Sequence, residues 1–316
     1  MATLPVGAAV QVRAPASSAN LGPGFDSIGL ALGVWDELDF IVTEAPGLTI
    51  EVSGSGADGV PRDESHLVYR SCVRALRELG CAAPQGLLMR TRNTVPHGRG
   101  MGSSATAIVA GVAAAYGLVG WTPDAPAEMP LSIDLAAVNR LASELEGHPD
   151  NASATVFGGM TLSWNDDVTD ETTTIGLSLH PEVTAVVFVP EATLATHTAR
   201  ALLPERVPLR DAALNSARAG LLVEAATRRP ELLVAATRDW LHQEARRPSY
   251  AASMALVDAL RAAGHAATIS GAGPSVLALT TFARVDAVVA PIATGTWRRL
   301  QPGIPRHGVV VTPLAH

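Results

Sequence analysis

The chain has 316 residues, 47% of them hydrophobic and 17% charged, with a formal net charge of −7 and a sequence pI of about 5.7. This length can bury a large core and suggests two domains. The acidic balance and the lack of a basic run argue against nucleic acid or an anionic membrane surface as a partner. The two cysteines, Cys72 and Cys81, form no CxxC motif, which argues against a disulfide framework or structural zinc and favours a reducing compartment.

The first fifteen residues lack the basic and then apolar layout of a secretory signal. The longest apolar run, residues 107–121, is shorter than the ~18 residues that a membrane helix needs. We therefore expect this run to form a buried core helix and the protein to be cytoplasmic.

Apolar periodicity predicts alternating strands and helices in the first half of the chain. Strands are expected at 9–14, 38–43, 48–53, 86–93 and 154–164. Helices are expected at 65–79, at the alanine-rich run that begins near residue 105, and at 131–146 with Ser132 as its cap. The pattern is that of a mixed α/β protein.

A polar and acidic stretch, residues 165–174, has no apolar periodicity and is the best candidate for a domain boundary. After it we expect strands at 182–190, 267–269, 276–279 and 309–312, and helices at 208–228, 230–238 and 250–263. We therefore expect an N-terminal domain at 1–168 and a C-terminal domain at 169–316.

The segment PHGRGMGSSATA, residues 96–107, carries the clearest functional signal. Its glycines fall at every second position, and glycine lets the backbone approach a ligand closely. Two serines then precede an alanine-rich run, which is typical of a helix start, where free N–H groups and the helix dipole attract phosphate. No lysine precedes the serines, so this is not the GxxxxGK[ST] loop. The alternative is a plain loop before a buried helix.

Two other segments combine tight turns with polar groups. APASSANLGPGFD, residues 14–26, could present Asn20 and Asp26 to a small polar ligand, although Asx residues also stabilise turns by themselves. TISGAGPS, residues 268–275, predicts a glycine turn between two strands, which could close over a nucleotide or form an ordinary hairpin.

ELEGHPDN, residues 144–151, gathers acidic groups around His148 at the end of a predicted helix. Gly147 and Pro149 should end this helix, so that Asp150 lies in a rigid loop. Mg²⁺ is usually held by one or two carboxylates together with substrate phosphates, which a glutamate here could provide. The alternative is a solvated helix face with a histidine cap. No second histidine or cysteine at ligand spacing supports zinc.

Together these segments resemble the GHMP kinase superfamily and, within it, the homoserine kinase family, over nearly the whole chain. The superfamily loop PxxxGLGSSAA is similar to PHGRGMGSSAT, where Met101 replaces leucine with a side chain of similar volume. SANLGPGFD and HPDN are similar to two segments of the homoserine kinases, and ISGAGPSVLAL resembles the third superfamily motif. The glycine loop alone indicates only the superfamily. SANLGPGFD together with HPDN indicates the homoserine kinase family within it.

The resemblance implies an α+β fold with the two-domain GHMP architecture: an N-terminal α/β domain with the phosphate loop and a C-terminal ferredoxin-like α/β sandwich. It implies transfer of the γ-phosphoryl group of ATP to the side-chain hydroxyl of L-homoserine, giving O-phospho-L-homoserine in threonine biosynthesis. Mg²⁺ is the implied metal, homoserine and ATP are the implied partners, and a homodimer is the expected assembly.

The resemblance also assigns residues to the nucleotide and the metal. The expected phosphate loop comprises Pro96, His97, Gly98, Arg99, Gly100, Met101, Gly102, Ser103, Ser104 and Ala105. Ser104 and Glu146 would hold Mg²⁺. Glu144 remains an alternative metal ligand, because the number of residues between the glutamate and the histidine varies among relatives.

The implied homoserine site draws on distant segments. Asn20 and Asp26 would contact the hydroxyl, and Asn151 would lie near the transferred group. The amino-acid part of the substrate would be bound by His148, Asp150, Thr196, Arg200 and Arg246, with Asp150 on the ammonium group and the two arginines on the carboxylate. The family usually has tyrosine before this second arginine, and here Ala245 stands there, which leaves Arg247 as a competitor.

The sequence leaves two questions about function open: the fate of the hydroxyl proton and the choice among related functions. Asp26 could accept the hydroxyl proton, or the proton could leave through the phosphate, because a loose transition state needs little early proton transfer. Another GHMP small-molecule kinase, or a nucleotide-binding regulator without catalysis, is the alternative function. The two arginines with Asp150 favour an amino-acid substrate, and the intact glycine loop and acidic segment favour a working enzyme.

Overall fold

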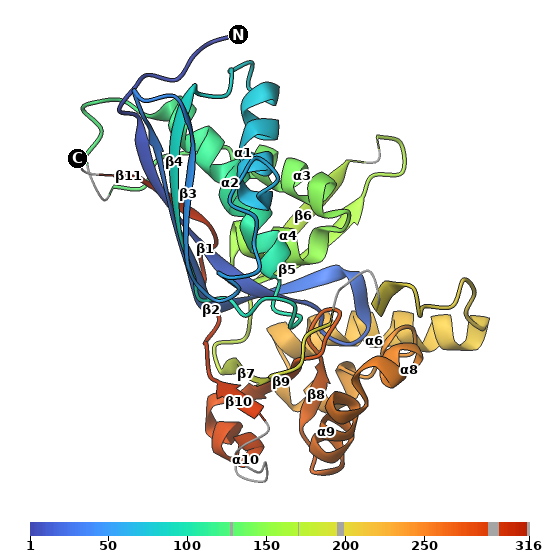
Figure 1. Cartoon of the computed structure of the whole chain (residues 1–316). Coiled ribbons are helices and arrows are strands. Elements are labelled where there is room, and N and C mark those ends of the chain that lie inside the picture. Colours follow the sequence, from blue (N-terminus) through green and yellow to red (C-terminus); the bar gives the residue numbers. More distant parts are fainter. Residues whose placement is uncertain (127–128, 170, 195–198, 290–296, 315–316) are drawn as a thin grey trace.

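The computed structural model describes residues 1–126, 129–169, 171–194, 199–289 and 297–314. Two β-sheets, each covered by helices, lie one above the other and are joined by several chain crossings (Figure 1). The architecture is α+β, as the sequence predicts.

The first sheet has the order β11-β1-β2-β4-β3, and β5 extends from β2 and pairs with β6. Its strands are β1 (Ala9–Asn20), β2 (Gly24–Val42), β3 (Gly47–Gly54), β4 (Gly86–Asn93), β5 (Met160–Asn165), β6 (Thr172–Leu177) and β11 (Val310–Pro313). The pairing of β3 with β4 is parallel, and the other pairings are antiparallel. The long β1–β2 hairpin reaches down from this sheet toward the second one (Figure 1).

Helices gather on one side of the first sheet (Figure 1). They are α1 (Leu67–Glu78), α2 (Ser103–Gly120), α3 (Leu135–Glu146) and α4 (Pro149–Phe157). By length and apolar composition α2 could cross a membrane, but 67% of that window is buried inside the protein, among the sheet and the other helices. The expectation of a buried core helix is confirmed.

The second sheet has the antiparallel order β10-β7-β9-β8. Its strands are β7 (Val183–Pro190), β8 (Ala266–Ile269), β9 (Val276–Thr281) and β10 (Trp297–Leu300). Alternate residues of β7 face opposite cores: Val187 packs in the core that contains α6 (Leu209–Thr227), and Phe188 packs in the core that contains α9 (Ala251–Ala262).

Short helices complete the second half. They are η1 (Pro230–Leu232), α7 (Leu233–Ala236), α8 (Gln243–Arg246), η2 (Arg247–Tyr250), η3 (Phe282–Arg284) and α10 (Val285–Val289). The expected helix at 230–238 is a 3₁₀ turn, η1, followed directly by one turn of α-helix, α7, which ends at Ala236.

Three local predictions are wrong. The expected strand at 154–164 begins as the end of α4, because Pro149 occupies the first turn and starts a helix that runs to Phe157. Asp150 therefore lies in a helical first turn and not in a loop. The helix expected from residue 131 begins at Leu135, where the Asp134 side chain accepts a hydrogen bond from the amide of Ala137 and caps it in place of Ser132.

The polar stretch 165–174 connects β5 to β6 within the first sheet, and β11 returns the end of the chain to that sheet beside β1. The division into 1–168 and 169–316 stays a proposal. In spatial terms the second sheet and its helices are formed by the residues between β6 and β11.

Candidate active site

The turn of the β1–β2 hairpin carries the strained backbone of the molecule. Asn20, Leu21 and Asp26 have φ angles of 70°, 49° and 53°, and they are the non-glycine residues with left-handed backbone in the part of the chain that the structure describes. Such conformations cost about 1–3 kcal/mol each and concentrate at functional sites. The Asn20 side chain holds the turn, since its Oδ1 accepts from the Asp26 amide at 3.0 Å and its Nδ2 donates to the Gly271 carbonyl at 3.1 Å.

The glycine loop packs tightly against two other segments. Gly98, Gly100 and Gly102 have φ angles of 64°, 70° and 68°. A Cβ atom at Gly100 would lie 2.2 Å from the Ser270 carbonyl oxygen, and one at Gly102 would lie 2.3 Å from Ser17 Oγ. Because backbone and hydroxyl atoms occupy this space, the loop requires glycine for packing as well as for conformation.

The first turn of α2 is left without a side-chain cap. Gly102 is its N-cap residue and neither following serine caps the helix, which corrects the expectation of a serine cap. Uncapped N–H groups at a helix start attract an anion. The side chains of Met101 and Ala105 are fully buried, so these two predicted loop residues can offer a ligand only their main chain.

Glu146 ends α3 beside the start of α2. Its Oε2 accepts a hydrogen bond from Ser104 Oγ at 2.8 Å. Burial raises the pKa of Glu146, and the Ser104 bond opposes this shift. Among the described residues no three acidic, histidine or cysteine side chains cluster as a metal cage, so a cation here would need ligands from elsewhere. One carboxylate and one hydroxyl fit Mg²⁺ that takes its other oxygens from phosphates and water.

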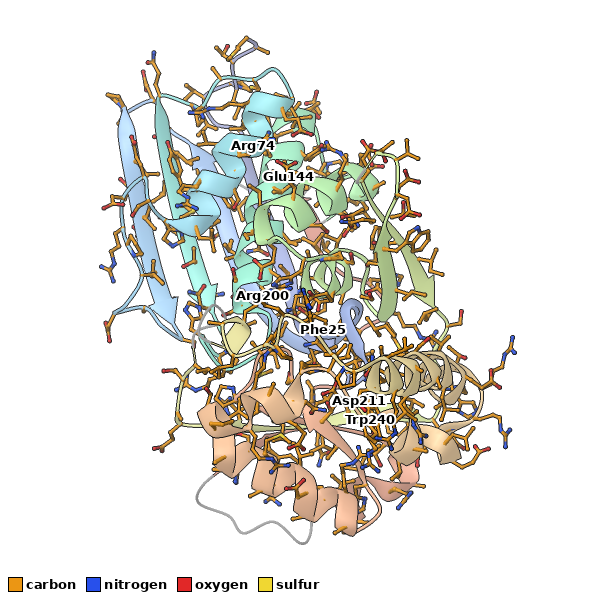
Figure 2. The ribbon with its side chains drawn as sticks, turned by 90° about the vertical axis from the view of Figure 1, so that its right-hand side faces the viewer. Phe25, Arg74, Glu144, Arg200, Asp211 and Trp240 are labelled. Atoms are coloured by element: carbon orange, nitrogen blue, oxygen red, sulfur yellow. The ribbon has the colours of Figure 1, made fainter. Side chains whose placement is uncertain are left out.

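Glu144 faces away from this site. It forms ion pairs with Arg74 at 3.3 Å and with Arg140 at 4.0 Å on the outer surface of α1 and α3. Figure 2 shows Glu144 beside Arg74, well above the labelled Phe25 and Arg200. Its geometry is that of a surface ion pair.

The start of α4 presents a buried carboxylate. Asp150 is 1% exposed, and its Oδ1 lies 2.9 Å from His148 Nδ1. Burial alone would lower the pKa of His148, but the bond and charge of Asp150 raise it above its usual value. Burial also raises the pKa of Asp26, with Asp150 adding to the shift and Arg200 opposing it.

Two guanidinium groups flank the ring of Phe25. The Cζ atoms of Arg200 and Arg246 lie 5.8 Å and 5.7 Å from the ring centroid. Arg200 forms an ion pair with Asp26. Arg246 is only 3% exposed; its Nε donates to the Ala199 carbonyl at 3.0 Å, and no carboxylate of the described residues forms an ion pair with it. Burial lowers the pKa of this guanidinium, and the charges of Asp26 and Asp239 oppose that shift only in part.

Arg247, the competing arginine, lies outside the cleft and is bound by Glu244 and Asp258 on the surface. Thr196 lies outside the residues that the structure describes.

One cleft between the two sheets gathers most of the other predicted groups, but the loop residues Pro96, His97, Arg99, Met101 and Ala105 do not line it. Its lining includes Asn20, Phe25, Asp26, Gly98, Gly100, Gly102, Ser103, Ser104, Glu146, His148, Asp150, Asn151, Leu194, Arg200, Arg246 and Gly271. These residues come from both halves of the chain, so the cleft exists only in the folded whole.

Comparison with known proteins now decides the family. Models of the GHMP kinases N-terminal domain and the GHMP kinases C-terminal region match residues 66–159 and 219–295. The chain is 48% identical to a homoserine kinase of Streptomyces coelicolor over 308 residues, 98% of this chain and 96% of that protein. It is 49% identical to one of Rhodococcus opacus over 289 residues, 88% of this chain and 90% of that protein. The chain belongs to the homoserine kinase family of GHMP kinases.

Solved structures agree with this membership. A homoserine kinase from Cytophaga hutchinsonii superposes with a TM-score of 0.80 at 27% identity, covering 96% of this chain and 97% of that one. A mevalonate diphosphate decarboxylase from Enterococcus faecalis, at 15% identity and a TM-score of 0.67, shares the fold alone.

Sequence reasoning missed the buried hydroxyls that fix the shape of this cleft. Ser17 Oγ donates to Asn151 Oδ1 at 3.0 Å, and Ser17 N donates to the Met101 carbonyl at 3.1 Å. Ser270 Oγ bonds Ser18 Oγ at 2.8 Å and the Gly100 carbonyl at 2.6 Å. The two serines can be read in the segment SSANLGPGFD, but no local sequence pattern shows which groups they bind.

A second cavity, of about 720 Å³, lies beside the glycine loop and was also missed. Its walls include Asn93 before the loop, Pro96 at the start of the loop, and Trp297 and Arg298 of β10. Asp36 anchors this approach to the loop: its Oδ1 accepts from the amides of residues 94 and 95, and burial raises its pKa to about 6.

Arg99 attaches the loop to the second half of the chain. Its guanidinium donates to the carbonyls of Pro190 at 2.9 Å, His97 at 3.1 Å and Glu191 at 2.8 Å. We expect Arg99→Ala to raise the KM for ATP about ten- to hundredfold, because about 1.5–3 kcal/mol of charge-assisted bonding that orders the loop is lost.

Steady-state kinetics with varied ATP measure this effect. The KM for ATP should rise less in Arg99→Lys than in Arg99→Ala. Arg92→Ala is the matched control, since Arg92 is an exposed arginine of β4 that pairs with Glu37. An unchanged KM in Arg99→Ala would mean that the loop holds its shape without this attachment.

Proposed function

We propose that this chain transfers the γ-phosphoryl group of ATP to the side-chain hydroxyl of L-homoserine and forms O-phospho-L-homoserine for threonine biosynthesis. The observation that carries the proposal is the buried Arg246 guanidinium, which forms no ion pair with the described residues and lies in the same cleft as Asp150 and the glycine loop. An amino acid supplies the two complementary charges: its carboxylate for the arginine and its ammonium for the aspartate.

ATP binds with its phosphates on the main-chain N–H groups of residues 98–104 and the start of α2. The uncapped helix end supports this placement. The nucleoside occupies the cavity beside the loop, whose volume of about 720 Å³ is ample for it. Ser104 and Glu146 hold Mg²⁺ together with the phosphates, and the bound ion supplies neutralisation of phosphate charge.

Homoserine lies between the hairpin turn and the start of α4. Arg246 and Arg200 bind its carboxylate, Thr196 is a further substrate-binding residue, and Asp150, which His148 supports, binds its ammonium group. The substrate carboxylate separates Arg200 from Asp26, whose carboxylate then orients the hydroxyl. Asn20 holds Asp26 in place, and Asn151, oriented by Ser17, contacts the transferred group.

Phosphoryl transfer of this kind depends on positioning and charge neutralisation more than on a strong base. The strained hairpin turn and the buried hydroxyls serve that purpose, because they fix the donors and acceptors before the substrates arrive. We further propose a homodimer in the cytoplasm and the domain division between residues 168 and 169.

An acceptor panel tests the function. Purified protein with Mg²⁺ and ATP is incubated with L-homoserine, mevalonate, shikimate or galactose, and ADP release is followed. We expect turnover with homoserine and background with the other three. Turnover with another acceptor and none with homoserine would assign a different GHMP kinase, and ATP binding without turnover would assign a regulator.

A further inference from the structure

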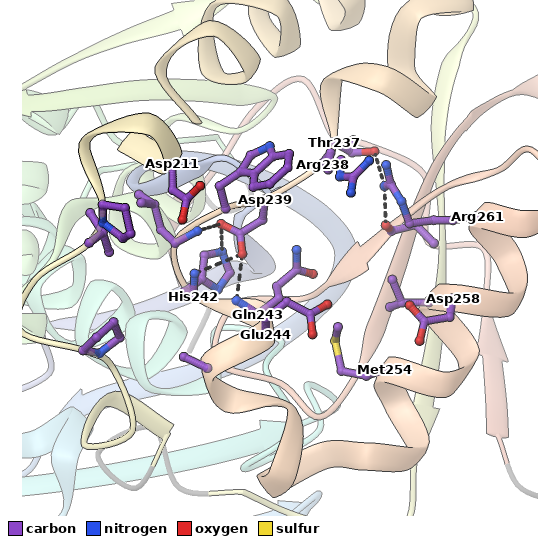
Figure 3. Close-up of a pocket in the computed structure, with 18 of the residues that line it drawn as sticks. Asp211, Thr237, Arg238, Asp239, His242, Gln243, Glu244, Met254, Asp258 and Arg261 are labelled. Carbon is purple, nitrogen blue, oxygen red and sulfur yellow. Dashed lines mark hydrogen bonds and ion pairs between the residues drawn. The ribbon is translucent and has the colours of Figure 1, made fainter. Parts of the chain in front are cut away.

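A large cavity in the second half of the chain lies outside the substrate cleft. It has a volume of about 630 Å³ and is enclosed by the start of α6, the segment 237–245 and α9 (Figure 3). No residue lines both this cavity and the cleft described above. The proposed reaction therefore leaves it unused.

The carboxylates in its wall are already bound. Asp211 pairs with Arg210, and Glu244 and Asp258 both pair with Arg247. Asp239 accepts from the amides of residues 241, 242 and 243, as Figure 3 shows in part.

The arginines in the wall form no ion pairs with the described residues. Arg206 and Arg238 form no ion pair with the described residues, and Arg261 donates only to neutral oxygens, at Thr237, Ala267 and Val234. Unpaired guanidinium groups around a cavity favour an anion, and their fork geometry suits carboxylate or phosphate oxygens.

Apolar side chains form much of the rest of the wall. Trp240 supplies an aromatic face, over which the Arg238 guanidinium lies 4.8 Å from the ring centroid, and Met254 and Val257 of α9 continue the apolar surface. Figure 2 shows Trp240 beside Asp211, well below the Arg200 and Phe25 of the cleft. A ligand for this cavity needs an apolar body as well as an anionic group.

We propose that this cavity is a regulatory site for a small organic anion, a carboxylate or phosphate group on an apolar body, whose binding changes the affinity of the cleft for homoserine. The proposed effect on homoserine affinity rests on the proposed function, whereas the proposed binding of an anion in this cavity does not.

The physical connection is the wall between the two sites. His242 lines the cavity, and on its other side it bonds the Gly22 carbonyl at 2.9 Å, packs against the Phe25 ring at 5.2 Å between centroids, and lies 3.4 Å from Arg246 Nη1. His242 immediately precedes α8, the four-residue helix that carries Arg246. A ligand that shifts this wall therefore shifts the proposed carboxylate anchor.

A neighbouring residue makes a second connection. Gln243 Oε1 accepts from the Ile269 amide at 2.7 Å and from Thr268 Oγ1 at 2.9 Å, just before the glycine turn that contacts the phosphate loop. Both connections run through buried side chains, which transmit displacement because they have little room to rearrange.

Binding is tested first, without ATP or homoserine. Benzoate and phenyl phosphate are titrated by calorimetry into the wild-type protein, the Arg206→Ala/Arg238→Ala double variant and the Arg70→Ala control, an exposed arginine on α1. We expect saturable binding of at least one probe that is at least tenfold weaker in the double variant and unchanged in the control. The two probes distinguish a carboxylate from a phosphate ligand.

Thermal unfolding of the double variant checks its fold, which should be unchanged because both arginines are exposed. Equal binding in the double variant and the wild type would place the probe elsewhere, in the substrate cleft or the phosphate loop, and would overturn the proposal. The absence of saturable binding of both probes would overturn it as well.

Coupling is tested by kinetics at a saturating concentration of the bound probe. We expect the KM for homoserine to change at least threefold in the wild type and not in the double variant. Binding without any change in KM would overturn the regulatory role. If homoserine is not a substrate, the proposed function fails, while the calorimetric result still decides whether the cavity is an anion site.

Discussion

Glu146→Gln is expected to lower kcat about a hundredfold or more and to raise the Mg²⁺ concentration needed for half-maximal activity. Glutamine keeps the shape and the bond to Ser104 but removes the charge that holds a divalent cation, and metal neutralisation of phosphate is worth several kcal/mol in such reactions. The measurement is a set of initial rates against Mg²⁺ at fixed, saturating ATP and homoserine.

Glu144→Gln is the matched control, because Glu144 is on the same helix and pairs with surface arginines. It should change kcat by less than about twofold, since exposed ion pairs contribute little. A larger effect for Glu144→Gln than for Glu146→Gln, with both variants folded, would reverse the metal assignment.

Arg246→Lys is expected to raise the KM for homoserine about ten- to hundredfold and to leave the KM for ATP nearly unchanged. Lysine keeps the charge but loses the fork that bonds both carboxylate oxygens, at a cost of about 1.5–3 kcal/mol. The measurement compares homoserine with 3-aminopropan-1-ol, which has the same amine and hydroxyl but no carboxylate.

On this substitution the KM for 3-aminopropan-1-ol, which lacks the carboxylate, should rise much less than the KM for homoserine. Arg247→Lys is the control, because Arg247 lies outside the cleft and pairs with Glu244 and Asp258. If Arg246→Lys weakened both acceptors equally, the buried guanidinium would have a structural role and not bind the carboxylate.

The segments that form the cleft could be predicted from sequence because each has a local signature. Alternate glycines before an alanine-rich helix, and an asparagine and aspartate around Gly22 and Gly24, restrict the backbone by themselves. Their assembly in one cleft was expected only through the family resemblance.

The supporting contacts could not be predicted, because they join residues far apart in the chain. Ser17 reaches Asn151 across 134 positions, and Ser270 reaches Ser18 across 252. The first part of the strand expected at 154–164 was wrong because its apolar residues suit a buried helix equally well, and only Pro149 at the start of α4 distinguishes the two; the second part is β5.

Identification of the product tests the central claim most directly. Protein, Mg²⁺, ATP and L-homoserine are incubated together, and the phosphorus-containing products are identified by ³¹P NMR with coupling to ¹H. We expect ADP and one new phosphomonoester whose phosphorus couples to two methylene protons, as a phosphoryl group on the side-chain oxygen requires. Free phosphate alone, or a phosphoryl group on the carboxylate or the amine, would contradict the account.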